Sequence, residues 1–115
     1  MPDNPTPSNS ENCPPDGVRF LLGRFVNAPR FPLGRLVATP NALGVLTQDD
    51  ILPALGRHLS ADWGDLDEQD KRENDRALHE GSRLLSRSLS SQGVRFWIIT
   101  EWDRSVTTVL LPEDY

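Results

Sequence analysis

The sequence predicts an α+β domain with a four-stranded, mainly antiparallel sheet and two helices packed on one face of that sheet. Two stretches with helical spacing are followed by three short segments whose apolar residues alternate. Short connections between these segments favour antiparallel pairing, and one strand ahead of the helices gives the order β-α-α-β-β-β. A chain of 115 residues has room for one such domain.

Two segments precede this domain. Residues 1–17 hold five of the ten prolines and no large apolar residue beyond Met1, so we expect a disordered tail there. Residues 18–30 form an apolar extension that could dock on the sheet, although Gly23 and the prolines that follow weaken the case for a regular strand. The α+β domain itself is expected over residues 31–115.

The first elements of the domain are marked by their ends. A short strand over residues 33–39 is stopped by Pro40, and residues 41–46 suit a turn or short helix. Thr47 has the character of an N-cap, so a helix is expected over residues 48–59.

The second helix is expected over residues 66–79. Asp65 and Glu68 have the spacing of a capping pair at its start, and Gly81 follows its end, where a left-handed residue commonly closes a helix. Beyond Gly81 the period of the apolar residues changes to two, which predicts strands. The three predicted strands cover residues 84–89, 94–101 and 106–111.

The net charge of −5 belongs to one segment. Between Asp62 and Glu80 there are eight acidic and three basic residues, which gives −5, and the rest of the chain sums to zero. An acidic segment without a basic stripe repels phosphate backbones, so direct nucleic-acid binding is disfavoured. No apolar run approaches the roughly 20 residues that span a bilayer, and no secretion signal is evident, so we expect a cytoplasmic protein with no membrane partner.

No cofactor or metal signature is present in the sequence. Cys13 has no second thiol, and His58 and His79 lack the spacing of zinc ligands. Neither a phosphate-binding glycine loop nor a nucleophile elbow occurs. We therefore expect no cofactor and no metal.

Three blocks of residues stand out between residues 31 and 115. They are Phe31-Pro-Leu-Gly-Arg-Leu-Val-Ala-Thr-Pro40, Asp62-Trp-Gly-Asp-Leu66 with Lys71-Arg-Glu-Asn74, and Trp97-Ile-Ile-Thr-Glu101 with Asp103-Arg-Ser-Val-Thr-Thr-Val-Leu-Leu-Pro-Glu-Asp-Tyr115. In these blocks the chain resembles a family of short bacterial plasmid-related proteins carried on plasmids and other mobile elements. The resemblance implies a genomic setting and no particular activity.

Glu73 is the carboxylate of the second helix that we single out. The apolar stripe of this helix consists of Leu66, Ala77 and Leu78, and helical spacing puts Asp70, Glu73 and Asn74 on the same face. We therefore expect Glu73 to point towards the sheet. There it would pair with an arginine such as Arg83 or Arg95, the favoured interpretation, or serve as a shielded carboxylate in acid–base chemistry.

An interaction surface is predicted from the central strand, residues 94–101. This strand has apolar residues on both faces, and the helices can cover only one of them. The second face must be covered by residues 18–31, by another copy of the chain, or by a partner. The pattern therefore favours a protein that acts by binding.

Two functional hypotheses follow. The leading one is a small non-enzymatic accessory protein that binds another protein, or itself, through its acidic helix and an aromatic surface; in a mobile element it could modulate a host nucleic-acid enzyme. Its candidate binding residues are Trp63, Asp65, Asp67, Glu68, Asp70, Trp97 and Trp102. The alternative is a small nuclease or hydrolase, which would need its catalytic side chains to converge on one concave site. The catalytic candidates are His58, Asp62, Glu73 and Arg83.

Overall fold

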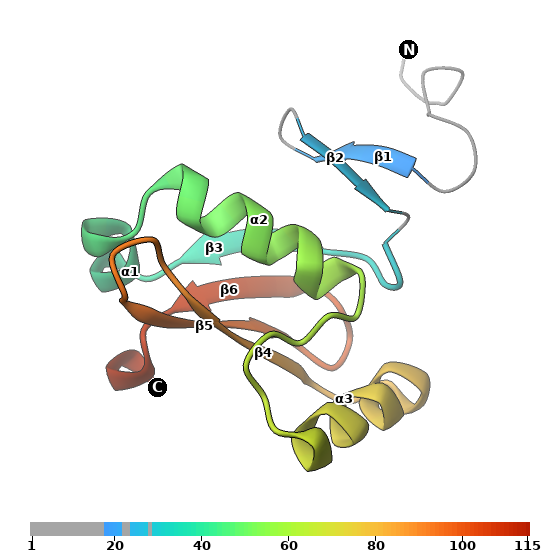
Figure 1. Ribbon diagram of the computed structural model, residues 1–115. Coiled ribbons are helices and arrows are strands. Elements are labelled where there is room, and N and C mark those ends of the chain that lie inside the picture. Colours follow the sequence, from blue (N-terminus) through green and yellow to red (C-terminus); the bar gives the residue numbers. More distant parts are fainter. Residues whose placement is uncertain (1–17, 22–23, 28) are drawn as a thin grey trace.

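The computed structural model describes residues 18–21, 24–27 and 29–115, and the tail expected over residues 1–17 lies outside them. The elements are shown in Figure 1. In chain order they are β1 (Val18–Leu21), β2 (Arg24–Asn27), β3 (Arg35–Ala38), α1 (Pro40–Val45), α2 (Gln48–Leu59), α3 (Glu68–Glu80), β4 (Leu84–Leu89), β5 (Arg95–Thr100), β6 (Val106–Leu110) and the short 3-10 helix η1 (Pro112–Asp114).

The main sheet has four strands in the order β3-β6-β5-β4. β4, β5 and β6 are antiparallel neighbours, whereas β3 pairs with β6 in parallel. The predicted α+β class and the mainly antiparallel sheet are confirmed. β1 and β2 pair with each other as a separate two-stranded sheet and do not extend the main one.

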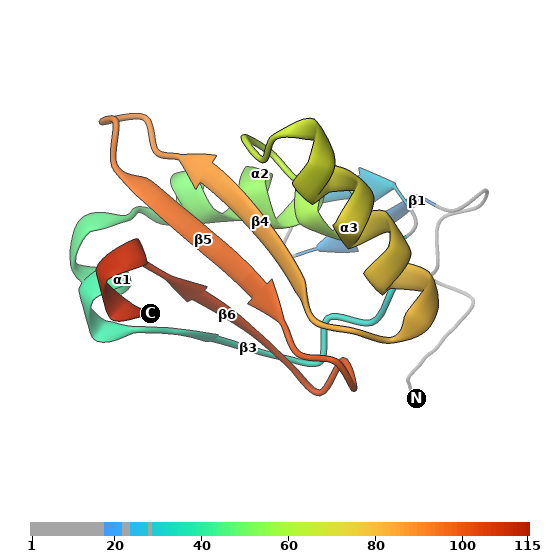
Figure 2. The same cartoon turned by 90° about the horizontal axis from the view of Figure 1, so that it is seen from below.

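The helices lie on one side and at one edge of this sheet. α2 crosses one face, and α3 runs beside β4 at the edge of the sheet (Figures 1 and 2). The core forms between α2 and the sheet, where Leu55 and Leu59 of α2 and Phe96, Ile98 and Val109 of the strands are buried. These strand residues alternate with outward-facing ones, as the period of two requires.

The backbone groups at the outer edge of β4 form hydrogen bonds with α3 and with the turn before it. Asn74 of α3 donates its side-chain amide to the carbonyl of Leu85 at 2.6 Å and accepts the backbone N–H of Leu85 at 3.2 Å. Further along, the backbone N–H of Arg87 donates to the carbonyl of Trp63, and the backbone N–H of Asp65 donates to the carbonyl of Arg87. An unpaired edge strand invites association with other chains, and these contacts remove that opportunity at β4.

α3 begins two residues later than its predicted capping pair implies. Asp67, and not Asp65, caps the helix, because its side chain accepts the backbone N–H of Asp70 at 2.8 Å. The backbone of Asp65 is already engaged with β4. The predicted end is confirmed: Gly81 caps α3 in a left-handed conformation with φ of 76°.

Candidate functional site

His58, a catalytic candidate, is a residue of α2 and is wholly buried on the side of that helix that faces the sheet. One ring nitrogen lies 2.5 Å from the hydroxyl of Ser86 and the other lies 2.9 Å from that of Thr100. The chain of hydroxyl groups continues from Thr100 to Thr107, which donates to the carbonyl of Leu33. Burial, and secondly the charge of nearby Arg104, lower the pKa of His58 to about 3. The imidazole is therefore neutral at physiological pH and joins α2 to the sheet.

Trp63 lies in the core and not on the surface. It is 2 % exposed, its ring stacks on Phe31, and it meets the edge of the His58 ring. Its indole N–H donates to Asp75 at 3.0 Å. Trp63 thus anchors the turn before α3 to the core, which removes it from the predicted binding surface.

The prediction that Glu73 points towards the sheet is wrong. Glu73 is exposed and pairs with Arg76 at 3.7 Å on the outer side of α3. The adjacent Asn74 takes the inward position. An amide can supply both a donor and an acceptor to the backbone of an edge strand without the cost of burying a charge, so it suits this position better than a carboxylate.

The four catalytic candidates do not converge. His58 is buried, whereas Asp62, Glu73 and Arg83 are exposed. Asp62 accepts the backbone N–H of Gly64, and Arg83 donates to the hydroxyl of Tyr115. Across the residues that the structure describes, no group of three or more His, Cys, Asp or Glu side chains is placed to hold a metal ion.

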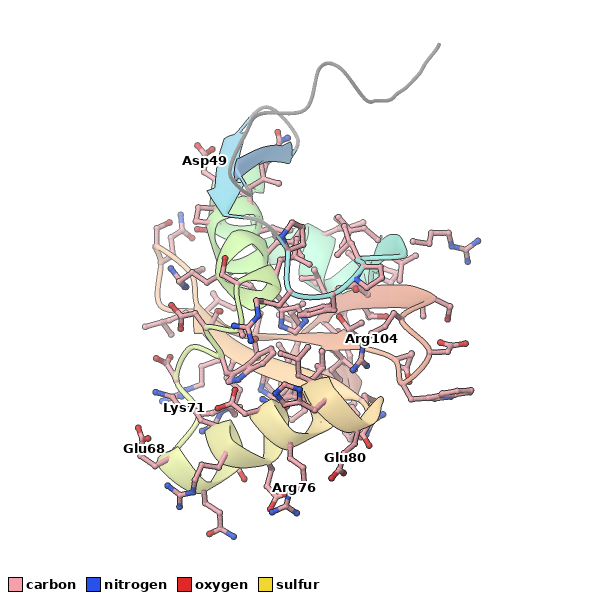
Figure 3. The ribbon with its side chains drawn as sticks, turned by 90° about the vertical axis from the view of Figure 1, so that its right-hand side faces the viewer. Asp49, Glu68, Lys71, Arg76, Glu80 and Arg104 are labelled. Carbon is pink, nitrogen blue, oxygen red and sulfur yellow. The ribbon has the colours of Figure 1, made fainter. Side chains whose placement is uncertain are left out.

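The acidic surface lies on α3 and on the turn before it. The predicted binding residues Asp65, Asp67, Glu68 and Asp70 are all exposed. Glu68 pairs with Lys71 at 3.7 Å, and Figure 3 shows Glu68, Arg76 and Glu80 pointing away from the sheet. Exposed i,i+3 ion pairs of this kind contribute little to stability. The four carboxylates are in contact with solvent because their side chains are exposed.

No described α-helix crosses the face of the sheet opposite α2 (Figure 2), and only the short η1 packs against β5 there. We call this surface the open face and define it by the strand residues whose side chains lie on the same side of the sheet as Trp97. Leu110 on β6 and Arg87 on β4 lie directly opposite Trp97. Ile99 and Arg95 lie two residues away on β5 and therefore point to the same side.

An aromatic pair lies on the open face. The rings of Trp97 and Tyr115 meet edge to face with centroids 5.5 Å apart. The guanidinium group of Arg83 lies over the Tyr115 ring, 5.4 Å from its centroid, and hydrogen-bonds its hydroxyl. Tyr115 is 66 % exposed and Trp97 is partly exposed. Trp102 is as exposed as Tyr115 but occupies the turn between β5 and β6.

Four arginines share the open face although their positions in the sequence are scattered. Arg87 lies opposite Trp97, Arg95 opposite Leu89, and Arg35 opposite Val106; Arg83 contacts Tyr115. The sequence alone does not reveal this set, because it depends on the register of four strands. Alternation within each strand was the available signal, since Arg83, Leu85 and Arg87 follow a period of two, as do Arg95, Trp97 and Ile99.

Comparison of the chain with protein-family models, curated proteins and solved structures finds no match. None of the described helices is both long and apolar enough to pass through a lipid bilayer.

Proposed function

We propose that this protein is a non-enzymatic accessory protein that acts by binding another protein, and that the open face of its sheet is the binding surface. The observation that carries the proposal is the uncovered face around Trp97 and Tyr115. A partly exposed aromatic pair with no described α-helix over it is a surface that a partner would be expected to cover.

The composition of this face supports a protein partner. Tryptophan, tyrosine and arginine are the residues most enriched at the energetic centres of protein interfaces, and here Tyr115 contacts both Trp97 and Arg83. Ile99 and Leu110 share this face but are already buried, so the exposed apolar surface belongs to Trp97 and Tyr115.

The acidic surface of α3 is a secondary element of the proposal. Its exposed carboxylates could present negative charge to a basic partner, such as a host nucleic-acid enzyme. A cytoplasmic location and a mobile-element setting belong to the same proposal, and the resemblance of residues 31–115 to plasmid-related proteins supports the setting.

The test is affinity capture from a native host lysate with matched baits. Trp97→Ala and Tyr115→Ala should each reduce capture of the principal partner by about tenfold or more, because each truncates an aromatic anchor. Leu43→Ala is the control, since Leu43 is 63 % exposed on α1, outside the open face. Equal capture by all baits at unchanged melting temperatures would reject the open face as the binding surface.

A further inference from the structure

We infer that the open face takes an acidic segment of the partner protein, whose carboxylates meet the arginines around Trp97. The inference rests on the proposed function, because it assumes that this face is where the partner binds. It specifies that the segment of the partner is acidic, because the side chains around Trp97 include several arginines.

The arginines surround the aromatic pair. Arg87 is the direct cross-strand neighbour of Trp97, Arg95 precedes Trp97 by two residues on the same strand, and Arg83 stacks on Tyr115. Arg35, at the far edge on β3, is also exposed. A ligand that covers the rings would therefore approach guanidinium groups from both β4 and β5.

These arginines have no carboxylate partner within the described part of the chain. The salt bridges seen there, Glu68–Lys71 and Glu73–Arg76, both lie on α3. A partner that covers Trp97 and Tyr115 also removes water from the neighbouring guanidinium groups, and unpaired buried charge is costly. A partner that brings carboxylates offsets this cost and can form bidentate arginine contacts.

Arg87 has a donor without an acceptor. Its Nη2 donates to the carbonyl of Asp65 at 3.1 Å, whereas its Nε is buried and has no hydrogen-bond partner in the described structure. Such unsatisfied donors are uncommon in folded proteins. A modest shift of the side chain on binding would let a carboxylate accept from Nε.

Other occupants fit less well. The open faces of two copies would bring arginines against arginines, and the open face of one copy against α3 of the next would build open-ended chains. A nucleic acid would meet the acidic residues of α3, which runs beside β4, and the net charge of −5 opposes its phosphates.

The experiment is a titration of the full chain with three probes, followed by ¹H–¹⁵N NMR. The first is a synthetic peptide of glutamates flanking one leucine and one phenylalanine, the second is the same peptide with lysine for glutamate, and the third is an oligothymidine. We expect the acidic peptide to shift the Trp97 indole and Tyr115 signals, more weakly at high salt, and the lysine peptide to leave them unchanged.

Two matched double variants test whether the arginines of the open face bind the acidic peptide. Arg87→Gln with Arg95→Gln should weaken binding of the acidic peptide about tenfold, because two charge contacts are lost. Arg57→Gln with Arg72→Gln removes the same charge from two exposed helical positions and should leave binding unchanged.

Three results would overturn the inference. They are equal binding of the two peptides, equal losses in the two double variants, and tighter binding of the oligothymidine, which would make the open face a nucleic-acid surface. If Trp97→Ala loses the natural partner while Arg87→Gln with Arg95→Gln retains it, the proposed function stands and the acidic chemistry is wrong. If Trp97→Ala retains the natural partner, the proposed function itself fails.

Discussion

Adjacent residues of α3 occupy opposite environments. Asn74 is buried and holds both backbone groups of Leu85, whereas Glu73 points to solvent and meets only Arg76. Helical spacing placed Asp70, Glu73 and Asn74 on the face of the apolar stripe, but only Asn74 is buried, and Asp70 and Glu73 are exposed. Which residue turns inward depends on the backbone of β4, which needs a donor and an acceptor at one place.

Asn74→Asp should lower the free energy of unfolding by about 1 to 3 kcal/mol at neutral pH. The carboxylate can still accept the N–H of Leu85, but it faces the carbonyl of Leu85 without a donor. Glu73→Gln should change stability by less than about 0.5 kcal/mol, because it alters an exposed position. Chemical denaturation of both variants beside wild type measures the contrast, and equal losses would show that Glu73 also contributes to the packing of α3.

His58 should make the protein less stable as the pH falls. The pKa of His58 is about 3 in the folded protein and near 6.5 when unfolded. Below pH 6.5 the unfolded chain therefore takes up a proton that the folded protein excludes, and stability falls towards pH 3 by up to about 1.4 kcal/mol per pH unit.

His58→Gln removes this titration. The variant should be less stable at pH 7, because the contacts with Ser86 and Thr100 are disturbed, but its stability should vary less between pH 6.5 and 5. Unfolding free energies measured across that range compare the two proteins. Parallel curves would mean that His58 becomes protonated without unfolding.

The bounds of helices and strands are predicted best where residues close in the sequence determine them. Residues 48–59 and 84–89 match α2 and β4. A capping box fixes the start of α2, and the side chains of β4 alternate between buried and more exposed positions. The start of α3 was predicted too early because Asp65 looks like a cap in the sequence. In the fold its backbone N–H bonds Arg87, a contact between segments that no local pattern reveals.

Three glycines should respond differently to alanine. Gly81→Ala should cost about 1 kcal/mol, because φ is 76° although no atom would crowd the new Cβ. Gly64→Ala should cost more, since φ is 75° and the Cβ would lie 2.0 Å from the carbonyl oxygen of Arg87. Gly44→Ala in α1 should stabilise slightly, because the site is open and alanine favours helix. Melting temperatures should rank Gly44→Ala, wild type, Gly81→Ala and Gly64→Ala from highest to lowest; any other order contradicts these assignments.

Across the whole molecule, opposite charges gather in different places. The acidic residues of the 62–80 segment lie on and before α3, and four arginines lie on the open face. The acidic segment is contiguous and could be predicted from composition. The arginine set could not, because it exists only once β3, β4 and β5 take their places in the sheet, and the parallel pairing of β3 with β6 was not predicted.

Added salt should leave the melting temperature unchanged or raise it. The described salt bridges are two exposed i,i+3 pairs on α3, which contribute little, whereas salt screens the repulsion within the acidic segment. Thermal unfolding at low and high sodium chloride concentrations provides the measurement. A lower melting temperature in high salt would show that ion pairs stabilise the fold more than their exposure implies.

β6 is one of the two interior strands of the sheet and its last strand in chain order. It lies between β3 and β5, yet it is synthesised after both, and its Thr107 hydroxyl joins the carbonyl of Leu33 to Thr100. A nascent chain that stops before Val106 leaves β3 without its neighbour in the sheet. Pairing between such distant segments is slow. It also cannot begin until β6 has left the exit tunnel of the ribosome, so the sheet closes only after synthesis of its last strand.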